Sequence, residues 1–515
     1  MRKIITSVLS AALFLATVPA VAQAPSPARK PVRKNTQAQR YVRILEKNRG
    51  FATASWGVLA LDAKGDTLAE YRSRAKLVPA SNMKLITAGT ALHSLGADFK
   101  YQTTIACSGS VTEGVLDGDV YIIGGGDPTT ASKDSIAIPS DGLFWKWKTF
   151  LRSSEIATVK GRVIGDGRYF DGARENSTWT YDDIGTAYGT GGSGLSFYGN
   201  AQDFAVSAGA SAGAPVNISV VYPSTPWMKY SHHAVTGPAG TGNSLYLFTT
   251  DLAPTGGIRG TFALDRKPKT EEFSNKFPEM TCASYFVRNL EGSGIKVEGG
   301  YADIDPDGDV RGGDFLKKGR ALPPDSLRVL GRSQSPELWK IALETLHRSD
   351  NFYAETLFRT MGLKASGTAV YDSCKVAVAD VLDALGKFPA DGIRIEDGSG
   401  LSRRNYLSPE YMTAFLGAMK RSPAYAAFLK TLPSPGSNGT LKRVLPSEQP
   451  ALKSRIKMKS GSMDGILCYS GYILPSDGKP EDAIVFSIMT NNCTLPVPQV
   501  RAAITRIIAL LAAGN

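Results

Sequence analysis

Ser81 and Lys84 stand three residues apart in PASNMKLITAGTAL (79–92), where an apolar helical pattern begins. Residues at i and i+3 share one face of a helix, so the lysine amine could act as general base for the serine hydroxyl. A serine before a helix is also a common N-cap. Further S-x-x-K pairs occur, among them Ser73/Lys76 and Ser454/Lys457, which do not stand at the start of a helical pattern. The spacing alone therefore leaves both roles open for Ser81.

Two later segments contain residues that could supply the other functions that serine catalysis requires, namely protonation of the leaving group and binding of the substrate. HRSDNFYAE (347–355) places Ser349 and Asn351 between two helical patterns, although Ser, Asp and Asn also commonly end and cap helices. MKSGSMDG (458–465) is a strand-like run that contains Lys459. Its backbone could pair with an extended peptide, or it could be the edge of an ordinary hairpin. Each segment alone has a purely structural explanation.

The order of the three motifs is more specific than any one of them. S-x-x-K, S-x-N and K-[ST]-G in this order form the serine acyl-enzyme set of β-lactamases and penicillin-binding proteins. In this chain S-x-N occurs only at 349–351 and K-[ST]-G only at 459–461. Two competing motifs are weaker, because GASAG (209–213) lacks a strand-to-helix elbow and GGGDP (124–128) lacks the helix and lysine of a P-loop. The ordered set predicts that Ser81 is a nucleophile.

The elements that must position these motifs fall into three stretches. Residues 41–98 contain both helical and strand patterns, and residues 326–515 again contain both. Between them, residues 99–325 consist of short β-runs with regular turn signals and one helical pattern at about 279–291. This organisation predicts an α/β fold interrupted by a β-rich insertion, with a further subdomain nested at about 203–272.

The first 24 residues have the form of a secretory signal peptide, with a basic start, an apolar stretch and A-x-A patterns ending at Ala22 and Ala24. Pro25 is a poor residue after a cleavage site, which favours cleavage after Ala22. The proline-rich basic segment 25–40 predicts a flexible tether. No later segment has 18 consecutive apolar residues, so we expect a secreted or periplasmic protein without a transmembrane segment.

Composition adds few functional constraints. The net charge of +12 fits either attraction to anionic envelope polymers or a solvated surface with excess lysine, and nothing resembles a nucleic-acid-binding module. The five scattered cysteines predict either one disulfide that the sequence cannot assign or buried free thiols. The four histidines have no H-E-x-x-H spacing, and neither a metal nor a cofactor is expected.

The chain resembles class C low-molecular-mass penicillin-binding proteins, the D-alanyl-D-alanine carboxypeptidase/endopeptidase family. The resemblance extends to the long insertion between the first two motifs, to the residues around the second motif (SDNFYAE), and to three further stretches: GGGDP, YDDIGTAYG and DGSGLSRRNYLSP (397–409). It implies an antiparallel sheet flanked by helices, an all-helical lobe, and a serine DD-peptidase that cleaves peptidoglycan stem peptides and is acylated by β-lactams. The alternatives are a β-lactamase and a non-enzymatic peptidoglycan-binding protein or β-lactam sensor.

The resemblance also implies a role for each catalytic residue. Ser81 attacks the carbonyl of the penultimate D-Ala, with Lys84 as its general base. Ser349 relays a proton to the leaving amine, and Lys459 adds positive potential. Asn351 holds the substrate amide.

The substrate-binding residues that the resemblance implies form two groups: Ser460, Gly461, Ser462 and Met463 in the strand motif, and Asp183 and Tyr188 in the insertion. The hydroxyls of Ser460 and Ser462 bind the terminal carboxylate, although threonine is commoner at the first position and also frequent at the second. The backbone N–H groups of Ser81 and Ser462 form the oxyanion hole. Asp183, Tyr188 and Met463 receive the amine-bearing end of a diamino acid, with Asp182 as the alternative if the alignment slips by one.

Overall fold

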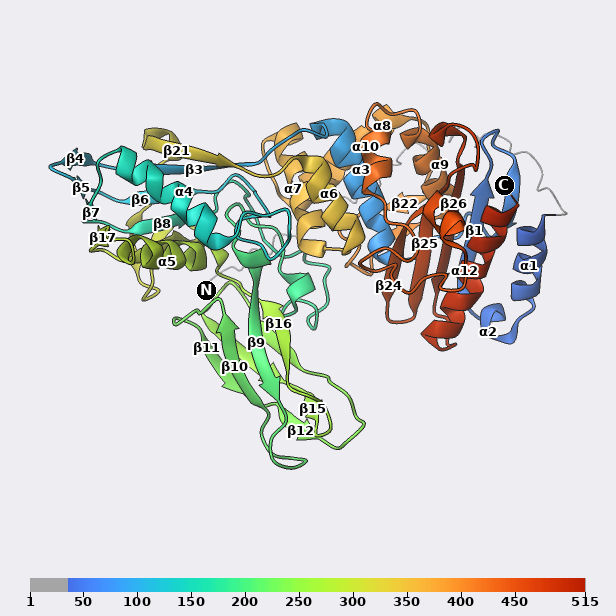
Figure 1. Cartoon of the computed structure of the whole chain (residues 1–515), viewed down its shortest axis with the longest axis horizontal. Coiled ribbons are helices and arrows are strands. Elements are labelled where there is room, and N and C mark those ends of the chain that lie inside the picture. Colours follow the sequence, from blue (N-terminus) through green and yellow to red (C-terminus); the bar gives the residue numbers. More distant parts are fainter. Residues whose placement is uncertain (1–35, 515) are drawn as a thin grey trace, which may run out of the picture.

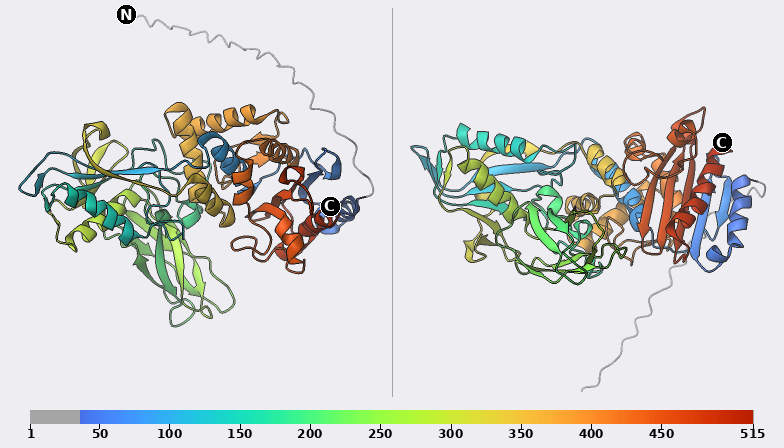
Figure 2. Two further views of the ribbon diagram at one scale, coloured as in Figure 1. Left: turned by 45° about the horizontal axis from the view of Figure 1, so that its top comes forward. Right: turned by 60° about the horizontal axis from the view of Figure 1, so that its bottom comes forward.

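The computed structural model describes residues 36–514. A helical region lies between a sheet at one end of the molecule and the insertion at the other, and a β-rich arm projects from the insertion (Figure 1, Figure 2). The predicted signal peptide and residues 25–35 of the predicted tether lie outside the described residues. Residues 37–40 of that tether belong instead to α1 (Gln37–Glu46), because the Thr36 hydroxyl caps this helix and its apolar face is buried.

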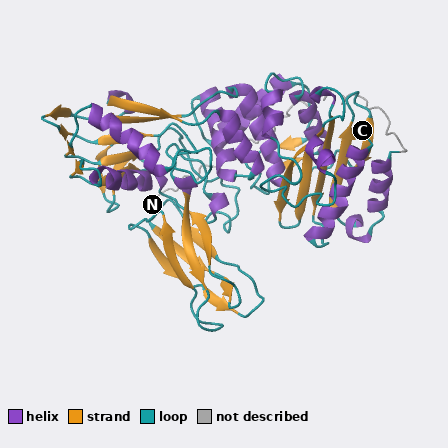
Figure 3. Ribbon diagram, in the orientation of Figure 1, coloured by secondary structure: helices purple, strands orange, loops and turns teal. Residues whose placement is uncertain are grey.

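The sheet at one end joins strands from the two ends of the chain. Its five strands are all antiparallel to their neighbours and follow the order β2 (Thr67–Tyr71), β1 (Ser55–Leu61), β26 (Ile484–Asn491), β25 (Ile466–Ile473) and β24 (Ile456–Met463). One face packs against α1 and α12 (Val497–Ala513), and the other faces the helical region (Figure 3). The outer strand β24, which carries the K-S-G motif, is therefore paired on one side only.

The helical region packs around α3 (Met83–Leu95), whose residues 83–92 are all buried. Its neighbours are α6 (Leu338–His347), α7 (Asn351–Ser366), α8 (Tyr371–Leu385), α9 (Pro409–Met419) and α10 (Tyr425–Thr431). Helix α3 ends at Leu95, and its C-cap residue, Gly96, has a φ of 88°. The first two motifs therefore lie at the starts of α3 and α7, two helices in direct contact.

The insertion contains one sheet of seven strands and one of four. The larger sheet has the order β20 (Lys317–Arg320), β19 (Asp309–Gly312), β18 (Tyr301–Ile304), β8 (Val163–Asp166), β6 (Val120–Ile123), β3 (Gln102–Cys107) and β21 (Arg328–Gln334). The smaller one has the order β17 (Lys296–Val297), β7 (Thr158–Val159), β5 (Val115–Asp117) and β4 (Ser110–Thr112). Because β21 pairs with β3, the insertion sheet extends beyond the predicted boundary at 325. The other domain boundaries stay a prediction.

The insertion has two long helices where the sequence indicated one. Helix α5 (Pro278–Glu291) lies where we expected it, but α4 (Ser140–Ser153) was missed. Its sequence, SDGLFWKWKTFLRS, begins with turn-forming residues and is rich in aromatic residues, which have modest helix propensity. Burial of Leu143, Phe144, Trp147 and Leu151 against the insertion core stabilises this helix.

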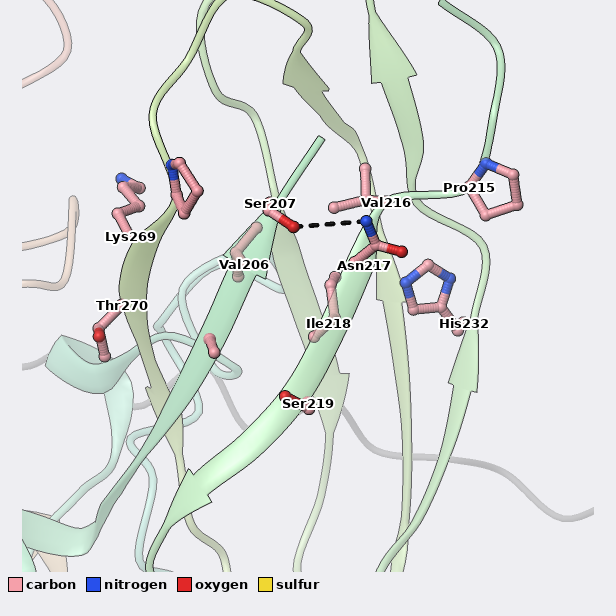
Figure 4. A pocket seen from close by; sticks show the side chains of 12 residues that line it. Val206, Ser207, Pro215, Val216, Asn217, Ile218, Ser219, His232, Lys269 and Thr270 are labelled. Atoms are coloured by element: carbon pink, nitrogen blue, oxygen red, sulfur yellow. Dashed lines mark hydrogen bonds between the residues drawn. The ribbon is translucent and has the colours of Figure 1, made fainter. Parts of the chain in front are cut away.

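The projecting arm is formed by β9 (Ala201–Ser207) to β16 (Lys269–Ser274). One sheet has the order β10 (Asn217–Tyr222), β9, β16, and the second has the order β11 (Lys229–His232), β14 (Thr255–Arg259), β13 (Tyr246–Thr249). A shallow hollow of about 730 Å³ is lined by residues of β9, β10 and β16 and by His232 of β11, and within it the Asn217 amide donates to the Ser207 hydroxyl (Figure 4). GASAG lies in the loop between β9 and β10 and is not followed by a helix, as expected.

Three further expectations concern cysteines, metals and membranes. All five cysteines lie within the described residues and are free thiols, four of them buried. Between residues 36 and 514, no cluster of His, Cys, Asp and Glu could hold a metal ion. In that same range no helix combines the length and apolar character needed to cross a membrane.

Candidate active site

Ser81 lies in a single 3-10 turn, Ala80–Asn82, that runs directly into α3. The N-cap position of α3 belongs to Asn82, and its side chain makes no capping hydrogen bond. The Ser81 hydroxyl instead accepts a hydrogen bond from Lys84 Nζ at 3.0 Å. The Ser81 side chain therefore faces the lysine and does not cap α3.

Lys84 is fully buried, and its amine has three hydrogen-bond partners. Besides Ser81 Oγ, Nζ donates to Asn351 Oδ1 at 2.6 Å and to the Ser399 carbonyl oxygen at 2.7 Å. Burial lowers the pKa of Lys84 to about 8, although nearby carboxylates act in the opposite direction. About a tenth of this amine is therefore neutral at pH 7, far more than for an exposed lysine, and only the neutral form can act as a base.

Ser349 occupies the tight turn between α6 and α7. Its φ is +61°, which is rare for a residue with a side chain, and the next residue, Asp350, caps α7 by accepting the Tyr353 N–H at 2.9 Å. The turn directs the Ser349 hydroxyl at Lys459, whose Nζ donates to it at 2.9 Å. The Asp350 cap thus fixes the start of α7 and, with it, the position of Ser349 in the preceding turn.

Lys459 connects the sheet to the helical region. It lies on β24, is fully buried, and donates to the Ser460 carbonyl oxygen at 2.7 Å as well as to Ser349. Burial, together with the positive charge of Lys84, holds the pKa of Lys459 well below its usual range. The structure therefore brings together the five residues that the motifs singled out: Ser81, Lys84, Ser349, Asn351 and Lys459.

The rest of the strand motif lies on the same outer edge. Ser460 is nearly buried and its hydroxyl donates to Thr440 Oγ1 at 3.0 Å, whereas Ser462 is exposed and Met463 is half-buried. Thr440 was not predicted, because it lies in an irregular loop with no recognisable pattern. Exposed hydroxyl and backbone groups at this edge are available to an extended ligand.

Gly461 lets β24 approach the Ser81 turn. A Cβ atom at this position would collide with the Pro79 carbonyl oxygen and lie 3.2 Å from the Ser81 nitrogen. Gly461→Ala should therefore lower the unfolding free energy by about 1–3 kcal/mol and slow acylation of Ser81 by about tenfold or more, because the strand must move away from the turn. Thermal unfolding and labelling with fluorescent penicillin measure the two effects.

Gly417→Ala is the matched control, since a Cβ there meets no atom within 4 Å and the glycine lies inside α9. This substitution should leave labelling unchanged and stabilise the protein slightly, by up to about 1 kcal/mol. Equal labelling rates for the two variants would contradict the role given to the close contact at Gly461.

A cavity of about 300 Å³ lies beside Ser349 and Asn351. Its lining includes Tyr188, whose carbonyl oxygen accepts the Asn351 amide at 3.0 Å, but neither Asp183 nor Met463. Asp183 is half-buried and accepts a hydrogen bond from the Thr180 hydroxyl at 2.6 Å, while the neighbouring Asp182 is exposed. Of the residues predicted for the diamino acid, Tyr188 is thus the one placed next to the catalytic set.

A serine hydrogen-bonded to a buried lysine of lowered pKa, beside a second lysine–serine pair, is the arrangement expected of a serine hydrolase that works through an acyl-enzyme. The chain belongs to the D-Ala-D-Ala carboxypeptidase 3 (S13) family, whose model matches residues 39–512. It is therefore a serine-type DD-peptidase, and the predicted relationship to the low-molecular-mass penicillin-binding proteins is confirmed.

Individual relatives agree with this assignment. The D-alanyl-D-alanine carboxypeptidase of Actinomadura sp. (strain R39) is 29% identical over 455 residues, 86% of this chain and 78% of the relative. D-alanyl-D-alanine carboxypeptidase DacB of Haemophilus influenzae is 21% identical and aligns over 80% of each chain. The crystal structure of penicillin binding protein 4 (dacB) from Haemophilus influenzae has a TM-score of 0.74 at 21% identity, covering 92% of this chain and 98% of that one. The predicted α/β fold is confirmed.

Proposed function

We propose that this protein is exported and cleaves peptidoglycan stem peptides with Ser81 as the nucleophile and Lys84 as its base. The observation that carries the proposal is the 3.0 Å hydrogen bond between Lys84 Nζ and Ser81 Oγ at a fully buried amine. In the first step, neutral Lys84 removes the hydroxyl proton while Ser81 Oγ attacks the carbonyl carbon of the penultimate D-Ala. General-base assistance of this kind is worth about 10²–10⁴-fold in rate.

Collapse of the tetrahedral intermediate breaks the peptide bond and requires a proton on the leaving amine. Ser349 is suited to relay to this amine the proton that Lys84 accepted, which returns Lys84 to its neutral form. Lys459 is hydrogen-bonded to the Ser349 hydroxyl and adds positive potential beside it. The N–H groups of Ser81 and Ser462 would bind the oxyanion, each such donor contributing about 10²–10³-fold. Water then hydrolyses the ester, with Lys84 again accepting a proton.

The outer strand is the proposed binding surface for the substrate backbone. The hydroxyls of Ser460 and Ser462 would bind the terminal carboxylate of a carboxypeptidase substrate, and the Asn351 amide would hold a substrate peptide group. Tyr188 would contact the diamino acid side chain at the cavity beside Ser349. Asp183 and Met463 lie outside the lining of that cavity, and Asp183, whose acidic group favours an amine-bearing side chain, would act from beyond it.

Product analysis tests this proposal and separates its two forms. The enzyme is incubated with an uncrosslinked pentapeptide muropeptide and with a D-Ala-crosslinked dimer, and products are identified by mass spectrometry. Release of D-Ala shows carboxypeptidase activity, and conversion of dimer to monomers shows endopeptidase activity. A protein that forms a penicilloyl adduct but turns over neither muropeptide would be a binding protein or sensor, and the proposal would be wrong.

A β-lactamase remains the alternative among enzymes, since it uses the same three motifs. A β-lactamase must also activate water rapidly, and no E-x-x-L-N segment of the class A type follows Ser349 in the sequence. We therefore expect a long-lived penicilloyl adduct. Rapid multiple turnover of penicillin would favour the β-lactamase instead.

A further inference from the structure

Glu355 lies on α7 one turn after Asn351, so both side chains project from the same face of the helix. Its carboxyl group is fully buried and accepts the Ser399 N–H at 2.7 Å and the Gly398 N–H at 3.3 Å. The carbonyl oxygen of that same Ser399 accepts a hydrogen bond from Lys84 Nζ at 2.7 Å. Glu355 is therefore connected to the base through a single residue.

The segment that makes this connection, residues 397–402, is held from several sides. Asp397 accepts the Gly400 N–H at 2.8 Å and the Ser402 N–H at 2.6 Å, which fixes the internal shape of the segment. On the side of α3, the Thr87 hydroxyl donates to the Gly398 carbonyl oxygen at 2.6 Å. On the side of α7, a Cβ at Gly398 would lie 2.8 Å from the Ala354 carbonyl oxygen. The segment thus fills the space between the two catalytic helices.

We propose that Glu355 is a positioning residue for the general base: by holding residues 398–399 against α7, it keeps the Ser399 carbonyl within reach of Lys84 and the lysine amine directed at Ser81. The inference rests on the proposed function, in which Lys84 is that base. Asn351 holds the amine directly from α7, and Glu355 holds it indirectly from the same helix.

The charge of Glu355 gives this role a measurable signature. Burial and the neighbouring Asp397 raise the pKa of Glu355 to about 7, and its ionised form raises the pKa of Lys84. Besides Lys84 and Asp397, the titratable groups that interact with Glu355 are Tyr371 and Cys374 on α8. Removing the negative charge lowers the pKa of Lys84. Since only the neutral amine is a base, the rise of acylation with pH then moves to lower pH.

Two substitutions separate the hydrogen bonds from the charge. Glu355→Gln keeps an acceptor for Ser399 and removes the charge, whereas Glu355→Asp keeps the charge and withdraws the carboxylate by one methylene. The second-order rate of acylation by fluorescent penicillin is measured from about pH 5 to about pH 10. Glu279→Gln is the matched control, a buried glutamate of the insertion that interacts with Arg174 and is not among the groups that act on Lys84.

We expect Glu355→Gln to move the midpoint of the pH profile down by about half a pH unit or more. Glu355→Asp should keep the wild-type midpoint and lose about tenfold or more in rate, because the base is misplaced.

A wild-type midpoint for Glu355→Gln, or a wild-type rate for Glu355→Asp, overturns the inference. If one variant does not fold, as judged by thermal unfolding, the other decides. If the wild type is not labelled, the proposed function is wrong. If the wild type is labelled but the variants behave like it, only the role of Glu355 is wrong.

Discussion

Ser81→Ala should abolish covalent labelling by penicillin and lower D-Ala release by at least about 10⁴-fold. The substitution removes the only atom of this residue that could form the ester, while the 3-10 turn and the start of α3 depend on the backbone and remain. Labelling with fluorescent penicillin followed by denaturing electrophoresis measures the loss. Mass spectrometry of the wild-type adduct should locate the label on the peptide that contains Ser81.

Ser454→Ala is the matched control, because Ser454 belongs to another S-x-x-K pair yet lies exposed on α11 (Pro450–Arg455), where its hydroxyl donates to the Ala451 carbonyl oxygen. This variant should label like the wild type. Persistent labelling of Ser81→Ala would assign the nucleophile to a different residue and contradict the site described above.

The second large effect concerns Lys84. In the wild type, acylation should rise with pH through about 8, because burial lowers the pKa of Lys84 to that value and only the neutral amine accepts a proton. Lys84→Met should reduce the acylation rate by about 10²–10⁴-fold and remove this rise. The measurement is the acylation rate as a function of pH for both proteins.

Lys76→Met tests whether the effect is specific. Lys76 is exposed, lies over the Tyr406 ring, and occupies the same place in its own S-x-x-K pair. Its replacement should leave both the rate and the pH profile unchanged. A Lys84→Met variant that keeps the wild-type pH dependence would show that another group is the base.

Much of the catalytic set could be predicted because its signals are local. The start of an apolar helix after Ser81 and a turn at Ser349 follow from short patterns that the structure reproduces. The ordered motifs then indicated which distant segments meet. Serine acyl-enzyme chemistry requires a serine, two lysines and an amide at defined distances from one another. A chain that contains all of these motifs in order therefore has few other ways to arrange them.

The groups that orient this set could not be predicted in the same way. Ser399 contacts Lys84 across 315 residues of sequence, and its contribution is a backbone carbonyl, which no side-chain pattern reveals. Glu355 resembles an ordinary helical glutamate until its partners at 398–399 are known. Helix α4 was missed because its local helix propensity is modest. Burial of its apolar face against the insertion core stabilises it, and the local sequence does not reveal that burial.

The order of strands in the five-stranded sheet has a consequence for when the enzyme becomes active. Its central strand, β26, pairs with β1 near the start of the chain and with β25 near the end. During synthesis the nucleophile emerges early, whereas Lys459 and β26 follow last. Contacts between such distant segments form late and slowly. An incomplete chain therefore holds Ser81 and Lys84 without the sheet that completes the site, and we expect hydrolytic activity only after β26 has been synthesised.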